Sequence, residues 1–180
     1  MVHNIVQGGA ASSVLAATLG IPLEVIDVGV NGVGRVQDTE SCRYFRAEAA
    51  AVGGVGDLSE AQAMDAETFE AAVQAGIGAV DRADEAKVLI VGELGIGNTT
   101  VASAVCARLI GCDPRKLVGR GTGVDDEGLA RKLRVVSKAL ASSTAHDAEA
   151  ALMQVGGREL AAMYGAIGRA VECRKVVVID

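Results

Sequence analysis

Aromatic side chains are almost missing from this sequence of 180 residues, which has no Trp, two Tyr and two Phe. Half of the residues are nonetheless hydrophobic, so Ala, Val, Leu and Ile must fill the core. A chain of this length can bury a sizeable core in one domain, and we predict a single domain over residues 1–180. Proline is scarce and glycine is frequent, so we expect glycines at turns and close backbone approaches.

Cysteine and histidine are too few and too scattered for a metal site. The four cysteines are Cys42, Cys106, Cys112 and Cys173. They form no CxxC pair and do not cluster with His3 or His146, so zinc spacing is absent. We therefore expect no metal, and we expect the reduced, mostly buried thiols of a cytoplasmic protein. Both histidines are interpreted as surface or hydrogen-bonded residues rather than catalytic ones.

Excess positive charge and long apolar runs are also lacking. The 17 Lys and Arg residues face 23 Asp and Glu residues, which gives a formal charge of -6 and argues against a nucleic-acid surface. No apolar run approaches the roughly 20 residues of a membrane span. The N-terminus lacks the basic-then-apolar order of a signal peptide. The sequence therefore predicts an intracellular protein that acts on neither nucleic acid nor membrane.

What the sequence does contain is a strand, a glycine-rich turn and a helix in succession. Val88–Val91 is a short apolar run that suits a strand buried on both faces of a parallel sheet. Glycines punctuate residues 92–97, and apolar residues then recur at helical spacing up to Leu109. This places Glu93 at the carboxyl end of the strand, the edge where open α/β sheets bind ligands.

A second glycine-rich loop lies at Val118–Gly123. Three acids follow it at 125–127, where a helix N-terminus favours negative charge. Lys132 lies about two turns into this predicted helix, within reach of the loop glycines. The alternative is that Lys132 belongs to a solvated basic face of the helix.

Further strands and helices alternate along the chain. We predict strands over 23–30 and 176–179, a helix-like stretch from Met1 to Leu19, and a helix that Asp65 caps. Another helix should bury the apolar stripe Leu160, Met163, Ile167 and Val171. Residues 40–62 show no clean period, and 53–57 suggests a loop. No helix follows the final strand, so either the chain was cut from something longer or a partner completes it.

Asp27 is unusual because it lies within an apolar strand. A buried carboxylate without partners is costly. Asp27 therefore either accepts hydrogen bonds from the glycine-containing loop that follows it or faces a ligand crevice, and the sequence leaves both open.

The chemistry of the chain must come from its two glycine-rich loops, because GxSxG, HExxH and Walker A motifs are absent. Backbone N–H groups between a strand and a helix bind anions. Glu93 lies beside one loop and Lys132 just beyond the other. This combination suits a phosphorylated ligand whose reacting centre develops positive charge.

Two long motifs also carry a resemblance to a known family. The segments 91–100 (VGELGIGNTT) and 119–132 (GRGTGVDDEGLARK) closely resemble the nicotinate-nucleotide:dimethylbenzimidazole phosphoribosyltransferase family. Gly156-Gly157, the strand around Asp27 and Gly8-Gly9 resemble the same family in the same order. The resemblance thus covers nearly the whole chain.

The resemblance implies a Rossmann-like α/β fold, a three-layer parallel sheet with helices on both faces that is incomplete relative to the family. It also implies a homodimer, no metal or redox cofactor, and transfer of phosphoribose from nicotinate mononucleotide to a benzimidazole base in cobalamin lower-ligand synthesis. By motif match, Glu93, Gly95, Gly121 and Lys132 would line the substrate and phosphate site, with Leu94 beside the base. Glu93 is the candidate catalytic residue.

The chain departs from that family in length. It lacks the N-terminal segment that helps to enclose the benzimidazole, and the late glutamate that acts as general base on the benzimidazole nitrogen. Glu93 could substitute for that glutamate, because a carboxylate beside an apolar strand can have a raised pKa. Three alternatives follow: an enzyme core, an inactive family member that binds a phosphorylated nucleotide, and a remnant that only dimerises.

Overall fold

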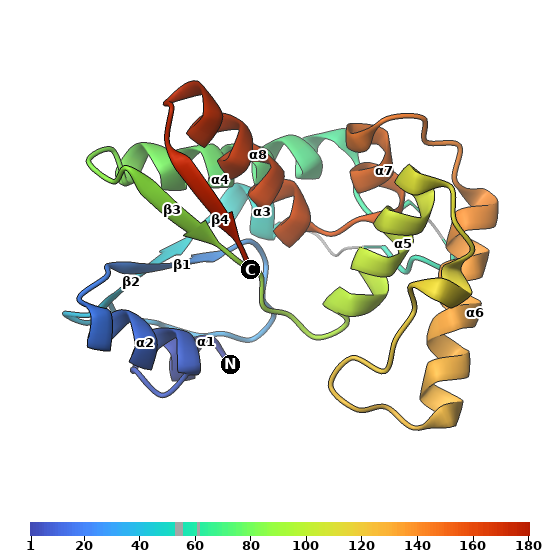
Figure 1. Ribbon diagram of the computed structural model, residues 1–180, viewed down its shortest axis with the longest axis horizontal. Helices are drawn as coiled ribbons and strands as arrows, with labels where there is room; N and C mark the ends of the chain where they lie inside the picture. The colour runs from blue at the N-terminus through green and yellow to red at the C-terminus, as the bar shows by residue number, and fades with distance from the viewer. Residues whose placement is uncertain (53–55, 61) are drawn as a thin grey trace. The chain divides into compact units, whose positions relative to one another are not determined.

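Two pairs of parallel strands form the framework of the chain in the computed structural model (Figure 1). The structure describes residues 1–52, 56–60 and 62–180. The chain divides into two units, Met1–Val52 and Gly53–Asp180, each with its own strand pair. The single domain expected from chain length stays a prediction. Part of the loop expected at 53–57 lies outside the described residues.

The first unit joins one strand pair to short helices. Its elements are α1 (Val2–Val6), α2 (Ala11–Leu19), β1 (Leu23–Asp27), β2 (Cys42–Arg46) and α3 (Glu48–Ala51). The predicted N-terminal helix is therefore two helices, because the chain turns at Gly8, where φ is +82°. The strand predicted over 23–30 ends at Asp27. Helix α2 ends at Leu19, as predicted, and Gly20 follows it in the left-handed conformation.

Strand β2 lies in the stretch for which the sequence predicted no element. It pairs in parallel with β1, Leu23 opposite Cys42 and Asp27 opposite Arg46. Cys42 points into a core that contains Val2 and Val6. The arginines of β2 are neutralised across the pair, where Arg43 lies 3.2 Å from the Glu24 carboxylate. A strand with this much charge becomes stable only beside its partner.

The second unit contains the other strand pair and the longer helices. Its elements are α4 (Ala66–Arg82), β3 (Val88–Val91), α5 (Asn98–Ile110), the 3₁₀ helix η1 (Pro114–Lys116), α6 (Asp126–Ser142), α7 (Ala148–Val155), α8 (Arg158–Glu172) and β4 (Val176–Ile179). Asp65 caps α4 as predicted, because its carboxylate accepts from Thr68 N at 2.8 Å. Strands β3 and β4 pair in parallel, with Val88 opposite Val176. The predicted α/β class with parallel strands is confirmed.

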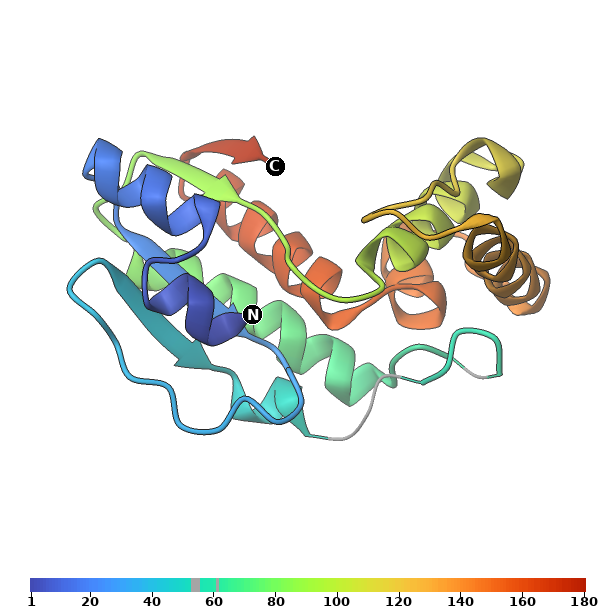
Figure 2. The same ribbon diagram turned by 90° about the horizontal axis from the view of Figure 1, so that it is seen from below.

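Helices α4 and α8 run side by side in both views (Figure 1, Figure 2). A Cβ atom at Gly76 would lie 1.8 Å from the Ala162 carbonyl oxygen, and one at Gly165 would lie 2.2 Å from the Val73 carbonyl oxygen. The two helix backbones therefore approach closely at Gly76 and Gly165, because glycine has no side chain to keep them apart. The buried residues of α8 are mostly small: Arg158, Ala161, Ala162, Gly165, Ala166 and Ala170.

The apolar stripe predicted for this last helix is therefore wrong. Val171 is 66% exposed, and Leu160, Met163 and Ile167 are only partly buried. Close contact between α4 and α8 selects the alanine and glycine face, because large side chains would hold the two helices apart.

The β3–β4 pair is covered on one face. There Leu89 and Val177 pack on Val80 of α4 and on Ala166 and Ala170 of α8. On the other face Val88 is 53% and Ile90 is 63% exposed. The expectation that Val88–Val91 is buried on both faces is therefore wrong.

Candidate functional site

The first glycine-rich loop connects β3 to α5 and leaves its apolar side chains in solvent. Leu94 is 60% and Ile96 is 99% exposed. Gly97, with φ at +94°, is the N-cap of α5. The Asn98 side chain folds back over Gly95, where an added Cβ would lie 2.3 Å from Asn98 Oδ1. The first-turn N–H groups of α5 thus lie at the end of this loop.

Lys132 reaches out of α6 to the junction of the two loops. Its Nζ donates to Thr99 Oγ1 at 2.8 Å and to the Gly119 carbonyl at 2.9 Å. Asp125 fixes the start of α6, since its carboxylate accepts from Gly128 N at 2.8 Å. The ammonium group is therefore held against the loops and is not simply part of a solvated basic face.

Gly121 lies at the same junction. Its φ is +59°, and an added Cβ would lie 2.9 Å from Thr99 Oγ1 and 3.3 Å from Lys132 Nζ. The predicted residues Gly121 and Lys132 thus come together around Thr99, which the sequence analysis contained only as part of the motif at 91–100. The place of Thr99 beside α6 is a tertiary contact between residues far apart in the chain.

Glu93 lies at the carboxyl end of the β3–β4 pair with two further carboxylates. Partial removal from water raises its pKa, and the charges of Glu159 and Asp180 add to the increase. Asp180 lies close to the loop, since a Cβ at Gly92 would lie 3.4 Å from its Oδ2. Burial also raises the pKa of Glu159 in the first turn of α8. No group able to hold a metal ion was found among the described residues.

Glu93 and Lys132 are not bonded to each other. In the ranges that the structure describes, no hydrogen bond or ion pair joins them, and the carboxylate of Glu93 has no hydrogen-bond partner. Leu94 and Gly95 lie on the loop between Glu93 and the start of α5. The candidate site therefore has a cationic part at Lys132 and a carboxylate part at Glu93. The sequence missed Thr99, Glu159 and Asp180.

Asp27 belongs to a different kind of arrangement, in the first unit. Its Oδ1 accepts from Gly29 N at 2.9 Å and Val30 N at 2.8 Å, and its Oδ2 accepts from Tyr44 Oη at 2.6 Å and Arg46 Nη1 at 2.7 Å. Burial alone would raise its pKa, but these partners lower it. Of the two alternatives, Asp27 therefore takes the one in which it holds the following loop.

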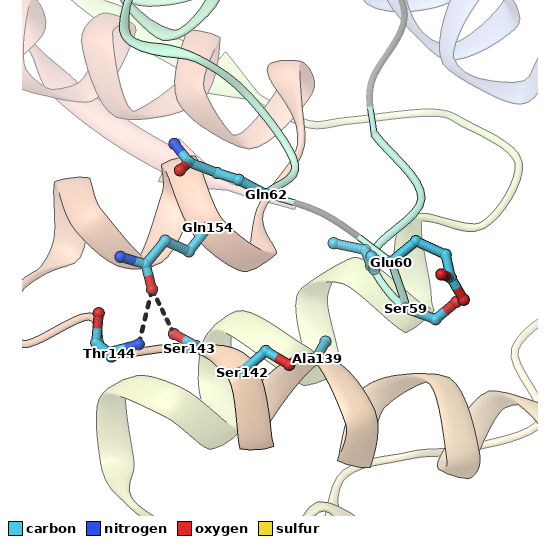
Figure 3. A pocket seen from close by; sticks show the side chains of 9 residues that line it. Ser59, Glu60, Gln62, Ala139, Ser142, Ser143, Thr144 and Gln154 are labelled. Atoms are coloured by element: carbon cyan, nitrogen blue, oxygen red, sulfur yellow. Dashed lines mark hydrogen bonds between the residues drawn. The ribbon is translucent and has the colours of Figure 1, made fainter.

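A polar pocket of about 270 Å³ lies elsewhere in the second unit (Figure 3). Gln154 Oε1 accepts there from Ser143 Oγ at 2.8 Å and from Thr144 N at 2.9 Å. Its lining includes Glu60 and Gln62 but neither glycine-rich loop. The candidate site is thus built on the loops and not in this pocket.

The histidine and cysteine predictions are resolved in part. His3 Nε2 lies 2.7 Å from the Val33 carbonyl oxygen, as expected of a hydrogen-bonded histidine. All four cysteines are unpaired, but Cys106 and Cys173 are exposed, so the prediction of mostly buried thiols is wrong for these two.

None of the described helices is long and apolar enough to cross a membrane.

These features define a Rossmann-like α/β protein in which two glycine-rich loops meet at the start of a helix. The family model described as Phosphoribosyltransferase matches residues 1–180. The chain belongs to this family, which includes nicotinate-nucleotide–dimethylbenzimidazole phosphoribosyltransferases.

Similar proteins agree in name and in fold. A Deinococcus radiodurans nicotinate-nucleotide–dimethylbenzimidazole phosphoribosyltransferase is 45% identical over 96% of this chain and 46% of its own length. A Bradyrhizobium protein of the same name is 43% identical over 100% of this chain and 51% of its own. The crystal structure of CobT from Thermus thermophilus has a TM-score of 0.82 and 39% identity, over 98% of this chain and 52% of that one. The chain spans about half the length of the curated relatives it matches.

Proposed function

We propose that this chain forms the core of an enzyme that transfers phosphoribose from nicotinate mononucleotide to dimethylbenzimidazole. The relatives named for this reaction support the substrate assignment. The observation that carries the proposal is the ammonium group of Lys132, which bonds to Thr99 and Gly119 beside Gly121.

The cationic part of the site takes the 5′-phosphate. A lysine ammonium group and the first-turn N–H groups of α5 are donors suited to a phosphate dianion. The left-handed turn at Gly121 lets the loop backbone approach both Lys132 and Thr99, because a side chain there would collide with the Thr99 hydroxyl. We infer that Gly95, Gly121 and Lys132 are substrate-binding residues.

The carboxylate part lies nearer the reacting atoms. A benzimidazole nitrogen attacks C1′ of the ribose, the bond from C1′ to nicotinate breaks, and the attacking base gives up its N–H proton. The carboxylate of Glu93, whose pKa is raised, accepts that proton more readily than an ordinary glutamate. Leu94 on the same loop would contact the base. These roles make Glu93 the proposed catalytic residue.

A second candidate function is nucleotide binding without transfer. The exposed side chains of Leu94 and Ile96 favour it for this chain by itself, since nothing in the described chain encloses the base beside them. A site open to water is poorly suited to excluding hydrolysis of the ribosyl centre.

The two functions are separated by binding and turnover. Calorimetry should show that nicotinate mononucleotide binds and that Lys132→Ala weakens binding at least tenfold. Mixing the mononucleotide with dimethylbenzimidazole should then release nicotinate if the chain is an active core. Binding without nicotinate release supports the second function, whereas equal binding by Lys132→Ala contradicts the phosphate site.

We also propose a homodimer in the cytoplasm. Exposed Tyr164 and Val171 on α8 support an apolar contact with a second copy. The four unpaired cysteines support a reducing compartment. Sedimentation equilibrium should give twice the mass of the chain, and a single monomeric species would contradict the dimer.

A further inference from the structure

We propose that Thr99 is a positioning residue of the phosphate site, one whose hydroxyl holds the Lys132 ammonium group over the first turn of α5. The inference rests on the proposed function, because it takes the ligand to carry a phosphate monoester. It assigns Thr99 a role that helix capping does not provide, since Gly97 is the N-cap of α5 and no side chain caps that helix.

Two of the three N–H donors of Lys132 Nζ have acceptors within the protein. An ammonium group has three N–H donors. Thr99 Oγ1 and the Gly119 carbonyl accept two of them, at 2.8 and 2.9 Å. One acceptor belongs to α5 and the other to the second glycine-rich loop, so together they fix the direction of the ammonium group. The third N–H is then left for a ligand at the junction.

Thr99 has a donor left as well. A hydroxyl group accepts through its oxygen and donates through its own hydrogen. Because Thr99 Oγ1 accepts from Lys132, its O–H hydrogen is available to a second acceptor. Thr99 lies in the first turn of α5, where the backbone N–H groups of Asn98 and Thr99 itself have no acceptor within the helix. Three kinds of donor therefore converge, an arrangement that suits the three oxygens of a phosphate monoester.

The backbone of Thr99 is itself fixed. Buried Ser103, one turn further along α5, donates from Oγ to the Thr99 carbonyl at 2.7 Å. The same Oγ lies 3.3 Å from the Leu117 carbonyl, just before the second glycine-rich loop. Ser103 thus lies between the Thr99 backbone and the residue that precedes the second glycine-rich loop. This support lets the Thr99 hydroxyl keep its position when no ligand is bound.

Holding the lysine in place should strengthen phosphate binding. A free lysine side chain loses rotamer entropy when a ligand fixes it. With Thr99 present, part of that ordering precedes ligand binding. A purely structural role for Thr99 would instead change the stability of the protein without any dependence on the ligand phosphate.

The test uses Thr99→Val, which keeps the shape of the side chain and removes the hydroxyl. Thr99→Ser keeps the hydroxyl, and Thr100→Val is the matched control on the next residue. Calorimetry with nicotinate mononucleotide should show about tenfold weaker binding for Thr99→Val, and binding within about twofold of the unmodified chain for the other two. Circular dichroism checks that each variant is folded, and Thr99→Ala removes the hydroxyl instead if Thr99→Val does not fold.

Two further measurements isolate positioning from structure. In the Lys132→Ala background, Thr99→Val should cause a smaller further loss than in the unmodified chain, because the part of its effect that acts through the ammonium group is already gone. Binding of nicotinate riboside, which lacks the phosphate, should be the same with and without Thr99→Val.

The outcomes also separate this inference from the proposed function. Binding that depends on Lys132 but not on Thr99 overturns the role of Thr99 alone. Additive losses in the double variant overturn it too. If nicotinate mononucleotide does not bind to the unmodified chain, the phosphate site fails and the role of Thr99 fails with it.

Discussion

Asp27 and Glu93 are two carboxylates at the carboxyl ends of parallel strands, and they differ in burial, in hydrogen-bond partners and in the direction of their pKa shifts. Asp27 is 2% exposed and accepts four hydrogen bonds, which lower its pKa. Glu93 is exposed, and partial desolvation with two neighbouring carboxylates raises its pKa. A carboxylate with all its partners holds a loop, whereas one without partners in the described chain remains available to a substrate.

The largest effect that we expect is on stability, where replacing Asp27 should cost far more than replacing Glu93. Asp27→Ala should lower the free energy of unfolding by about 3 kcal/mol, because two backbone N–H groups, Tyr44 and Arg46 lose their acceptor. Glu93→Ala should change it by less than about 0.5 kcal/mol. Urea denaturation of both variants provides the measurement. Similar losses in the two would contradict the division of roles.

A smaller effect should locate binding at the loops of the second unit. Gly121→Ala should weaken nicotinate mononucleotide binding about tenfold, since its Cβ would collide with Thr99 Oγ1 at 2.9 Å. Gly123→Ala is the matched control, because Gly123 also has a positive φ, +110°, but an added Cβ has no neighbour within 4 Å. Both variants share backbone strain, so only the difference between them reports on the junction. Calorimetry should therefore find the larger loss for Gly121→Ala.

The smallest effect that we expect is on the pH dependence of stability, which should have opposite signs for Asp27 and Glu93. The pKa of Asp27 lies below its ordinary 3.8, so the unfolded chain binds more protons there and Asp27's stabilisation is lost as pH falls below about 3.8. The pKa of Glu93 lies above its ordinary 4.5, so its contribution is present below 4.5 and is lost as pH rises through the folded-state pKa. Glu93→Gln should therefore be slightly more stable than the unmodified chain at pH 7 and no more stable at pH 4. Urea denaturation at both pH values checks this, and a difference of the opposite sign would refute it.

The fold was predictable wherever hydrophobic pattern and local signals agreed. The strand Val88–Val91, the Asp65 cap and the acidic start of the helix after residue 125 all follow from short segments of sequence. Strand β2 was not predictable, because its arginines are compensated by Glu24 and Asp27 on another strand. The buried face of α8 was misassigned, because small residues are buried there by helix contact rather than by hydrophobicity.

The candidate site, too, was predictable in part from local sequence. Motif spacing identified the loops and Lys132, but it could not identify the acceptors that hold the ammonium group. Thr99 and Lys132 are brought together only by the packing of α5 and α6. The charges of Glu159 and Asp180 reach Glu93 because the start of α8 and the end of β4 lie beside its loop. Such contacts depend on the tertiary fold and leave no local signal.

The most direct test of the account follows the side-chain carboxyl resonances of Asp27 and Glu93 by ¹³C NMR as nicotinate mononucleotide is added. Before addition, a pH titration should give a pKa below 3.8 for Asp27 and above 4.5 for Glu93. At saturation the Glu93 resonance should shift and the Asp27 resonance should stay in place. A ligand-dependent shift of Asp27 with an unmoved Glu93 would contradict the assignment of the site.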